Sequence, residues 1–600
     1  MFRAASRRAD VAAALAALVA VCALPIAAAA DPAGLYPTDT CVANKLRASA
    51  DYCWEAVQAF GRGDPSQTAD DQLLRARARL ESNWAKAEAK SLAAGVACDE
   101  TTATSSEMIS TLDAGASVIG TAIARSEAAT DAAEQKCEAR RTTAASQACH
   151  LLLWADAKHL LSRNTDRDRS QLESTRTRLD TQLAMLWNTG PANGCGGTLT
   201  GAEAVAAVGD AVESARGSLL VSPRVSSEWT MVTPDGEVPY QGKTLEPTCS
   251  GGTPWVFFVK RGSVNKTLMY YQGGGACWDY VSCRLPTHKT TTGPNDNPSR
   301  ATTGFANFSN PDNPFRDWNA VFVPYCTGDV HWGDATVEYT LGRQSVTIQH
   351  KGYVNAQVAE KWAREHFVNP DAVFVTGSSA GSYGAIVNSL PLQENVWPSS
   401  HFDVLGDAGN GVITQRFLEN DIARWGVEQN LPDWIPALNR PLVELTAADL
   451  WTASSLYYPR NRFANYSSAF DGGQGGQTGF YNTMLNPGNP IAWVSWWVPS
   501  CEWNAQMRAL VQDSASQAPN YRYYIGSGSR HTMWGNNKVY TDTTGGVPTI
   551  VSWIRAMLGG TVDWTNVETT DPGLLLPGDP RPNPSALPPY TDDGRVVCED

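Results

Sequence analysis

Histidine is scarce in this chain, and negative charge exceeds positive charge. Only 8 of the 600 residues are histidine, and the formal net charge is −14 at pH 7. An acidic protein lacks the cationic surface that binds a phosphate backbone, so we expect no nucleic-acid partner. Metal sites need histidine, cysteine or acidic ligands at short spacing. Residues 31–220 contain no such cluster, and we assign them no metal chemistry.

Long apolar runs are absent beyond the N-terminus. Residues 11–29 are apolar and rich in alanine, basic residues precede them, and the Ala-Ala-Ala run before Asp31 is typical of a cleavage site. We therefore interpret residues 1–30 as a secretory signal peptide. No other stretch approaches the roughly 18 apolar residues of a membrane-spanning helix. The sequence predicts export to the extracellular space or the periplasm, with no membrane span.

Cysteine, in contrast, is well represented. Removing Cys22 of the signal peptide from the 13 cysteines leaves an even number, which favours disulfides in an exported protein. Composition then divides the chain near residue 220. Residues 31–220 are rich in alanine, arginine and glutamate and predict an all-α domain. Residues 221–562 have short hydrophobic strands among glycine, proline and tryptophan and predict an α/β domain, followed by a proline-rich tail over 563–600.

The predicted helical domain contains an internal repeat. The residues Cys41, Cys53 and Cys98 recur 96, 96 and 97 residues later as Cys137, Cys149 and Cys195. Each unit predicts a long helix, a polar turn and a second long helix, so two hairpins would form a small antiparallel bundle. The region resembles cysteine-containing helical repeats that precede catalytic domains in some exported bacterial proteins. Whether it is a spacer or a binding domain stays open, and its partner is unknown.

Hairpin geometry predicts disulfides within each unit. The start of the first helix lies beside the end of the second in an antiparallel pair. Cys41 should therefore bond to Cys98, and Cys137 should bond to Cys195. Cys53 and its counterpart in the second unit, Cys149, are left over. They either bond to each other across the repeat interface or remain buried thiols.

Residues 373–384 have the pattern of a nucleophile elbow. A β-branched and aromatic run is followed by G-x-S-x-G over residues 377–381, with Ser379 at its centre, and then by a helix-forming stretch. Such an elbow exposes a serine hydroxyl above a sheet. Glycine and serine are common residues, so the alternative is an ordinary turn after a buried strand.

A nucleophilic serine needs a base, and α/β-hydrolases place serine, acid and histidine in that chain order. Two histidines follow Ser379, namely His401 and His531. His401 leaves too little chain for an intervening strand and acid. His531 follows a predicted strand over 521–525 and precedes a predicted helix over 549–558, so it is the predicted base.

The acid is less clearly marked. Asp471 ends a predicted strand and precedes a glycine-rich turn, from which its carboxylate could reach the base. Asp407 follows another predicted strand and is the second candidate, while Asp403, Asp433 and Asp449 also lie in this interval. Aspartate before glycine is often only a turn residue, and this alternative applies to both leading candidates.

Backbone N–H groups must stabilise the oxyanion that forms when an ester is attacked. One donor is expected from Ala380, directly after the nucleophile. Another is expected from the glycine-rich loop 273–275, which follows a predicted strand. Cys277 and Cys283 could staple this loop with a short disulfide. The cysteines that remain should pair among themselves: Cys249, Cys326, Cys501 and Cys598.

Four motifs together resemble the pectin acetylesterase/Notum family. They are residues 272–278 (QGGGACW), 323–333 (VPYCTGDVHWG), 377–381 (GSSAG) and 407–409 (DAG), and the similarity spans about 240–560. The resemblance implies an α/β-hydrolase-like sheet with helices on both faces, ester hydrolysis, and no metal or organic cofactor. Carried over by motif, the resemblance implies the catalytic residues Ser379, Asp471 and His531. It also implies that the oxyanion donors are Gly274, Gly275 and Ala380.

Two departures from the family leave the substrate open. Residues 275–276 are Gly-Ala where animal members have two aromatics, and the histidine that plant members carry is missing after Cys501. A fold does not transfer a substrate. We predict a secreted serine carboxylester hydrolase that removes short acyl groups, such as acetyl, from a polysaccharide. The alternative among enzymes is a deacylase of a lipid or lipidated protein. The alternative outside enzymes is a non-catalytic binding protein with an esterase-like shell.

Four further residues lie near these motifs. Trp278 and Tyr383 are candidates for lining the substrate pocket, although Tyr383 could equally pack in the core. Asp329 and His331 invite a metal or acid–base interpretation. Two isolated residues do not make a site, so a structural hydrogen-bonding role is predicted for both.

Overall fold

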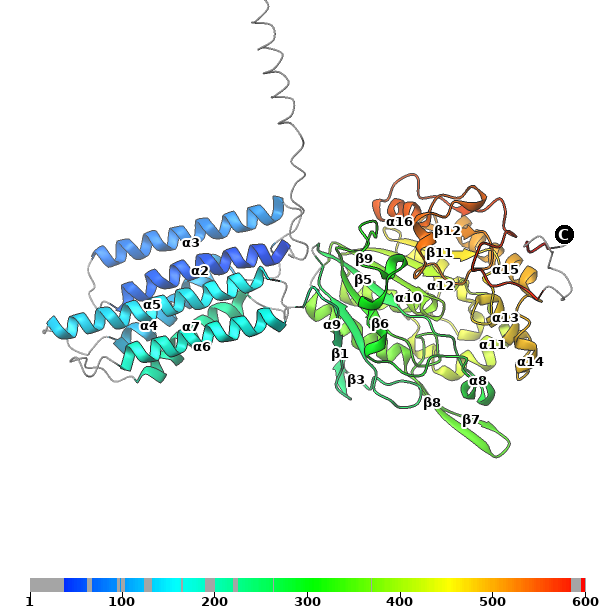
Figure 1. Ribbon diagram of the computed structural model, residues 1–600, viewed down its shortest axis with the longest axis horizontal. Coiled ribbons are helices and arrows are strands. Elements are labelled where there is room, and N and C mark those ends of the chain that lie inside the picture. Colours follow the sequence, from blue (N-terminus) through cyan, green and yellow to red (C-terminus); the bar gives the residue numbers. More distant parts are fainter. Residues whose placement is uncertain are drawn as a thin grey trace, which may run out of the picture.

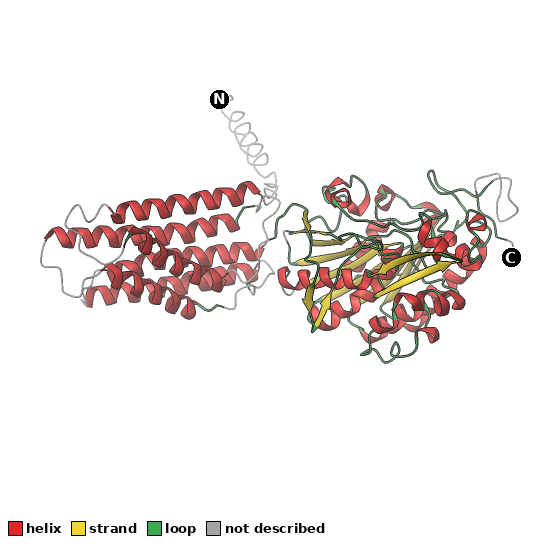
Figure 2. Cartoon of the chain, turned by 90° about the horizontal axis from the view of Figure 1, so that it is seen from below, coloured by secondary structure: helices red, strands yellow, loops and turns green. Residues whose placement is uncertain are grey.

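The computed structural model describes residues 37–61, 67–93, 98, 103–123, 132–162, 166–188, 200–219, 225–262, 264–367, 370–583 and 595–598. The predicted signal peptide and Cys195 lie outside these ranges. Figures 1 and 2 show two parts, a bundle of long helices and a domain built on one large sheet. Within the described ranges, no helix combines the length and the apolar character needed to cross a membrane.

The N-terminal part is the bundle of long helices. Its helices are α2 (Pro37–Gly61), α3 (Gln67–Ala93), α4 (Ser105–Ile123), α5 (Ala132–Leu160), α6 (Asp166–Asn188) and α7 (Gly201–Leu219). Each repeat unit therefore has three helices where the sequence predicted two, because α4 and α7 follow the predicted hairpins. Both of these helices begin with a T-x-x-E capping box, in which Glu107 and Glu203 accept hydrogen bonds from the backbone N–H groups of Thr104 and Thr200.

Disulfides join the helices of this bundle. The Cys41–Cys98 bond confirms the prediction from hairpin geometry. The Cys53–Cys149 bond joins α2 to α5 and so links the two repeat units, which is one of the two outcomes that the sequence left open. Cys137 is also disulfide-bonded. The bundle is therefore cross-linked both within a repeat unit and between units.

One nine-stranded sheet forms the second part, in the order β1-β4-β6-β5-β9-β10-β11-β12-β13. The strands are β1 (Thr230–Val232), β4 (Phe257–Lys260), β5 (Lys266–Tyr271), β6 (Asn319–Val323), β9 (Ala372–Ser378), β10 (His401–Asp407), β11 (Arg462–Ser468), β12 (Tyr521–Gly526) and β13 (Val567–Glu568). Strand β4 pairs antiparallel with β1 and β6, and every pair from β6 to β13 is parallel. Two hairpins lie outside this sheet, β2 (Val238–Tyr240) with β3 (Lys243–Leu245), and β7 (Ala335–Leu341) with β8 (Gln344–His350).

Helices cover both faces of the sheet, which confirms the predicted fold class (Figure 2). The α-helices of this part are α8 (Tyr280–Arg284), α9 (Gly352–His366), α10 (Ala380–Pro391), α11 (Gln415–Asn420), α12 (Ala447–Tyr457), α13 (Gln477–Leu485), α14 (Pro490–Trp493), α15 (Ser500–Gln517) and α16 (Ile550–Gly559). Strand side chains alternate between two apolar clusters: Met269 and Tyr271 of β5 belong to one, Leu268 and Tyr270 to the other. Burial on both faces explains the uninterrupted apolar runs of these strands.

Parallel pairing brings the carboxyl ends of β5, β9, β10, β11 and β12 to one edge of the sheet. The glycine-rich loop follows β5, Ser379 follows β9, and Asp407 ends β10. Asp471 and His531 lie beyond the ends of β11 and β12. Ligands of open α/β sheets bind outside the carboxyl ends of the strands. The fold thus gathers the sequence-predicted site residues at the edge where a ligand would bind.

Disulfides also fasten loops of the sheet domain. Cys277 bonds to Cys283, which confirms the predicted staple of the glycine-rich loop. The four other cysteines pair among themselves as predicted, in the bonds Cys249–Cys326 and Cys501–Cys598. The segment 563–600, which the sequence set apart as a tail, contributes β13 to the sheet and is bonded through Cys598 to the start of α15.

Candidate active site

Ser379 lies in a strained turn between β9 and α10. Its backbone has φ 57° and ψ −121°, a conformation that residues other than glycine rarely adopt. The glycines of the elbow leave no room for side chains: a Cβ on Gly377 would lie 2.1 Å from the Gly381 carbonyl oxygen, and one on Gly381 would lie 2.0 Å from the Tyr271 carbonyl oxygen. The G-x-S-x-G pattern is therefore required by the close approach of β5, β9 and α10. A strained serine beside a cavity is a candidate for function.

The glycine-rich loop after β5 lies against this elbow. A Cβ on Gly273 would lie 3.0 Å from the Cβ of Ser379. Gly275 has φ +77°, and a Cβ there would lie 1.9 Å from the Thr287 carbonyl oxygen, so this position requires glycine. Gly275, Ser379 and Ala380 line the same cavity. The two predicted sources of oxyanion donors are thus adjacent to the candidate nucleophile.

Residues 323–333 support the glycine-rich loop. A Cβ on Gly274 would lie 2.6 Å from the Tyr325 ring, so the loop packs directly on this side chain. The Tyr325 N–H donates to the Gln272 side-chain oxygen at 3.1 Å, and His331 Nε2 donates to the Gln272 carbonyl at 2.9 Å. Burial lowers the pKa of His331 to about 4. The ring is therefore neutral at pH 7, and its contacts are those of a hydrogen-bond donor to the loop.

Asp329 organises the turn within the same run. Its carboxylate accepts hydrogen bonds from the Thr327 hydroxyl at 2.6 Å, the Gly352 N–H at 2.7 Å and the His331 N–H at 3.2 Å. Burial raises the pKa of Asp329 to about 6. No group of three or more histidines, cysteines or acids in the described residues is arranged to hold a metal ion.

The structure places Asp471 in contact with His531. His531 Nδ1 donates to Asp471 Oδ1 at 2.6 Å, and the Gln477 N–H donates to the same oxygen at 3.1 Å. Asp471 is fully buried and has φ 31°. Burial lowers the pKa of His531, but the charge and hydrogen bond of Asp471 together with the charge of Asp407 raise it by more, so this pKa lies above its ordinary value. A buried carboxylate in this position favours the charged imidazolium.

Asp407, the second candidate acid, has different partners. Its carboxylate accepts a hydrogen bond from the Ser378 hydroxyl at 2.7 Å and from the N–H groups of Met533 and Trp534 at 3.0 and 3.1 Å. Burial raises the pKa of Asp407 to about 6. Asp407 thus ties the segment that follows His531 to the end of β10.

The nucleophile and base candidates are both attached to the end of β10. The Ser379 N–H donates to the Asp407 carbonyl oxygen at 2.8 Å, while the Asp407 carboxylate holds the segment after His531. Among the contacts of the described residues, Ser379 makes no hydrogen bond to His531. Catalytic hydrogen bonds are often long before substrate binds and shorten in the complex. The structure therefore joins acid to base and serine to glycine loop by direct contacts, and it attaches serine and base to the same strand end.

A cavity of about 440 Å³ opens beside Ser379. Trp278 and Tyr383, the two predicted lining residues, both face it. The Trp278 ring packs edge-on against Phe480, with 5.8 Å between the ring centres. The Tyr383 hydroxyl donates to the Gln477 side chain at 2.9 Å. Most of the lining is apolar, and the remaining apolar residues are Ala276, Leu285, Pro286, Val330, Pro490, Trp493 and Val494.

Sequence reasoning missed the part of this lining that comes from α13, α14 and their connection. Phe480, Trp493 and Val494 have no motif around them. Their signal is the absence of charge: residues 472–501 contain no lysine, arginine, aspartate or glutamate. A stretch of this length without charge, and with three tryptophans, indicates an apolar surface or pocket wall.

Comparison with known proteins identifies the family. A family model described as pectinacetylesterase matches residues 241–424. Human palmitoleoyl-protein carboxylesterase NOTUM is 28% identical over 189 residues, which are 29% of this chain and 36% of that protein. The inactive palmitoleoyl-protein carboxylesterase notum1b of Danio rerio is 35% identical over 101 residues, which are 16% of this chain and 70% of that protein. The chain spans about a third of the length of the first curated relatives that it matches.

Among solved structures, the Wnt deacylase Notum from Drosophila matches with 17% identity and a TM-score of 0.39, covering 54% of this chain and 92% of that one. The family-model match includes the glycine-rich loop, the run 323–333 and Ser379, whereas Asp471 and His531 lie beyond its end. The assignment of acid and base therefore depends on the geometry described above. By its matched region and its notum1b relative, this chain belongs to the pectinacetylesterase family.

Proposed function

We propose that this protein is a secreted serine carboxylester hydrolase. The observation that carries the proposal is the gathering of the parts of a serine esterase at one edge of the sheet. Ser379 shares a cavity with Gly275 and Ala380, and the Asp471–His531 pair follows the two neighbouring strand ends. Export is supported by the N-terminal sequence pattern and by disulfides in both parts of the chain.

The mechanism assigns a role to each of these groups. The Ser379 hydroxyl oxygen attacks the ester carbonyl carbon while His531 Nε2 takes its proton, and Asp471 stabilises the resulting imidazolium. Backbone N–H groups of Gly274, Gly275 and Ala380 are the proposed donors to the oxyanion, each of which is worth about 3–4 kcal/mol in such sites. The imidazolium then protonates the leaving alkoxide. A water molecule, deprotonated by His531, releases the acyl group and regenerates the serine.

Family membership alone does not decide activity, because the notum1b relative is named inactive. A fluorophosphonate probe tests the proposal directly, since it labels a serine that a neighbouring base activates. We expect wild type to be labelled, Ser379→Ala to be unlabelled and His531→Ala to be labelled at least a hundredfold more slowly. Ser516→Ala, which removes an exposed hydroxyl on α15, is the matched control. Absence of labelling in folded wild-type protein would leave the non-catalytic binding protein as the better description.

The cavity supports a larger acyl group than the acetyl that the sequence predicted. Its volume of about 440 Å³ lies within the range of about 300–1,000 Å³ that is usual for small-molecule sites. An acetyl group would fill only a small part of it. Apolar side chains also continue outward from the cavity, where Val494 is 48% and Ile491 83% exposed. These features favour the alternative of a deacylase acting on a longer apolar acyl ester.

A series of p-nitrophenyl esters of increasing chain length separates the two substrate classes. We expect kcat/KM to rise from acetate to octanoate as methylene groups enter the cavity, because each buried methylene contributes about 0.8 kcal/mol. A clear preference for acetate would instead support removal of acetyl groups from a polysaccharide. Neither outcome affects the assignment of the serine mechanism itself.

A further inference from the structure

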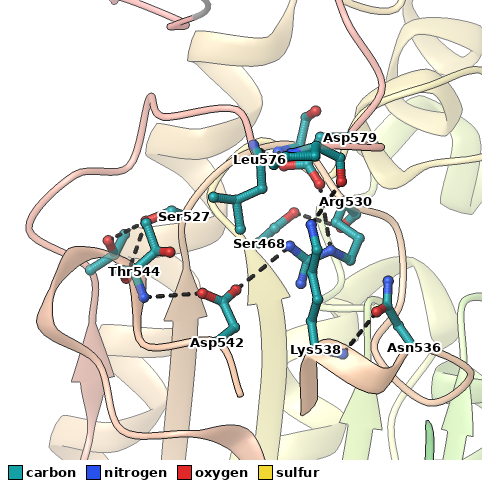
Figure 3. A network of polar contacts seen from close by, with 12 residues as sticks. Ser468, Ser527, Arg530, Asn536, Lys538, Asp542, Thr544, Leu576 and Asp579 are labelled. Atoms are coloured by element: carbon teal, nitrogen blue, oxygen red, sulfur yellow. Dashed lines mark hydrogen bonds and ion pairs between the residues drawn. The ribbon is translucent and has the colours of Figure 1, made fainter. Parts of the chain in front are cut away.

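The C-terminal segment 569–583 packs on the loop that carries His531, and Figure 3 shows Leu576 and Asp579 of this segment beside Arg530. The Ser529 hydroxyl donates to the Pro580 carbonyl oxygen, and the Ser529 N–H lies 3.4 Å from Asp579 Oδ2. The sequence set this segment apart as a proline-rich tail. Its contacts instead place it against the residues that directly precede the base candidate of the site.

A buried arginine links this segment to the base loop. Arg530 precedes His531, and its side chain is 8% exposed. Its guanidinium lies 3.5 Å from Asp579 Oδ1 and 3.6 Å from Asp542 Oδ2, so two carboxylates share one cation (Figure 3). The Asp579 side chain is fully buried and also accepts the Leu576 N–H at 3.0 Å. Buried charges are costly unless they are paired, and losing one partner leaves the other uncompensated.

The same arginine is connected to the acid loop through its backbone. The Ser468 hydroxyl donates to the Arg530 carbonyl oxygen at 2.7 Å and accepts the Asp471 N–H at 3.1 Å. A second bridge runs from the Gly472 N–H to the Ser529 carbonyl oxygen at 2.7 Å. Hydrogen bonds therefore connect the backbone around Asp471 to the backbone just before His531, at Ser529 and Arg530.

We propose that Asp579 is a positioning residue of the active site, which acts through Arg530 to hold the His531 loop in register with Asp471. The proposal rests on the proposed esterase function. Asp579 touches neither the cavity nor the reacting atoms, since no residue of 569–583 lines the cavity. Its effect should therefore fall on the geometry of proton transfer and leave substrate binding unchanged.

The variant Asp579→Asn tests the proposal. Small misplacements of catalytic groups cost up to about a hundredfold in rate, so we expect kcat to fall ten- to a hundredfold while KM stays within twofold. Asp571→Asn is the matched control: its carboxylate belongs to the same segment but pairs with an arginine of the C-terminus, and we expect wild-type kinetics.

A second variant distinguishes a loss of positioning from a loss of folding. The double variant Arg530→Gln/Asp579→Asn removes both members of the buried ion pair, and the Asp542 carboxylate that loses its cation is 16% exposed, so water can still solvate it. With a melting temperature near wild type, it should still show the reduced kcat. Wild-type kcat in either folded variant, or an equal loss in Asp571→Asn, would overturn the positioning role. Failure of wild type to react with the fluorophosphonate would instead refute the esterase function on which the proposal rests.

Discussion

The sharpest prediction concerns which carboxylate serves the base. Asp471→Asn keeps the size of the side chain but removes the charge that faces His531 Nδ1 across 2.6 Å. An amide there can no longer fix the tautomer of the imidazole or stabilise its charged form. Comparable losses in serine triads lower kcat by about 10³–10⁴, which corresponds to about 4–5.5 kcal/mol of transition-state stabilisation. We expect a loss of this size, with KM little changed.

The same variant has a second signature in its pH profile. Asp471 raises the pKa of His531 above its ordinary value, against the effect of burial. The base is active only when neutral, so activity in wild type should be lost as the pH falls through this raised pKa. Removing the carboxylate lowers the pKa, and the acid limb of kcat/KM should move to lower pH. Steady-state kinetics between pH 5 and pH 9, with about one measurement per half pH unit, resolve such a shift.

Asp407→Asn provides the contrast. This carboxylate accepts hydrogen bonds from Ser378, Met533 and Trp534, so its replacement should cost about 2–4 kcal/mol of unfolding free energy. We expect kcat to fall no more than about tenfold, because the contact between Asp471 and the base is retained. Denaturant unfolding and kinetics on the same samples separate the two effects. If Asp407→Asn abolished activity at unchanged stability while Asp471→Asn stayed near wild type, the assignment of Asp471 would be refuted.

Three further predictions concern other parts of the chain. Burial raises the pKa of Glu360 to about 8 from 4.5. The contribution of this side chain to stability is therefore fully present below pH 4.5 and is lost as the pH rises through about 8. In wild type the unfolding free energy should decline by roughly 3 kcal/mol between pH 4 and pH 7, and Glu360→Gln should abolish this decline. Gly275→Ala would place a Cβ 1.9 Å from the Thr287 carbonyl oxygen, and displacing an oxyanion donor in this way should lower kcat at least about a hundredfold. Non-reducing peptide mapping should recover a Cys53–Cys149 cross-linked peptide.

Each of these has a contrary outcome. A pH dependence of unfolding that is the same in Glu360→Gln and wild type would assign the decline to other buried groups. Gly236→Ala, where a Cβ has open space, is the control for Gly275→Ala, and equal kinetics in the two would remove the glycine-rich loop from the mechanism. A Cys41–Cys53 peptide would contradict the helical bundle, because twelve residues of one helix span about 18 Å.

The sequence predicted best where a constraint acts along the chain. The offset between the two sets of cysteines predicted the repeat, and antiparallel hairpin geometry then predicted the Cys41–Cys98 bond. It did not predict the third helix of each unit, although Thr104 and Thr200 mark the starts of α4 and α7 with equivalent capping boxes. Neither α4 nor α7 contains a cysteine, so the cysteine spacing carries no information about these two helices.

In this protein, the sequence by itself determined features that depend on residues close together in the chain. The tertiary structure decided those that depend on residues far apart in the chain. Its sequence alone indicated the elbow at Ser379 and the glycine loop, because backbone sterics admit only glycine at such close approaches. It left Asp407 and Asp471 as rival acids, since each follows a strand and precedes a turn. Only the fold decided that Asp471 contacts His531 while Asp407 binds the backbone beyond it. The order of parallel strands determines which loops become neighbours, and that order is set by packing between segments far apart in the chain.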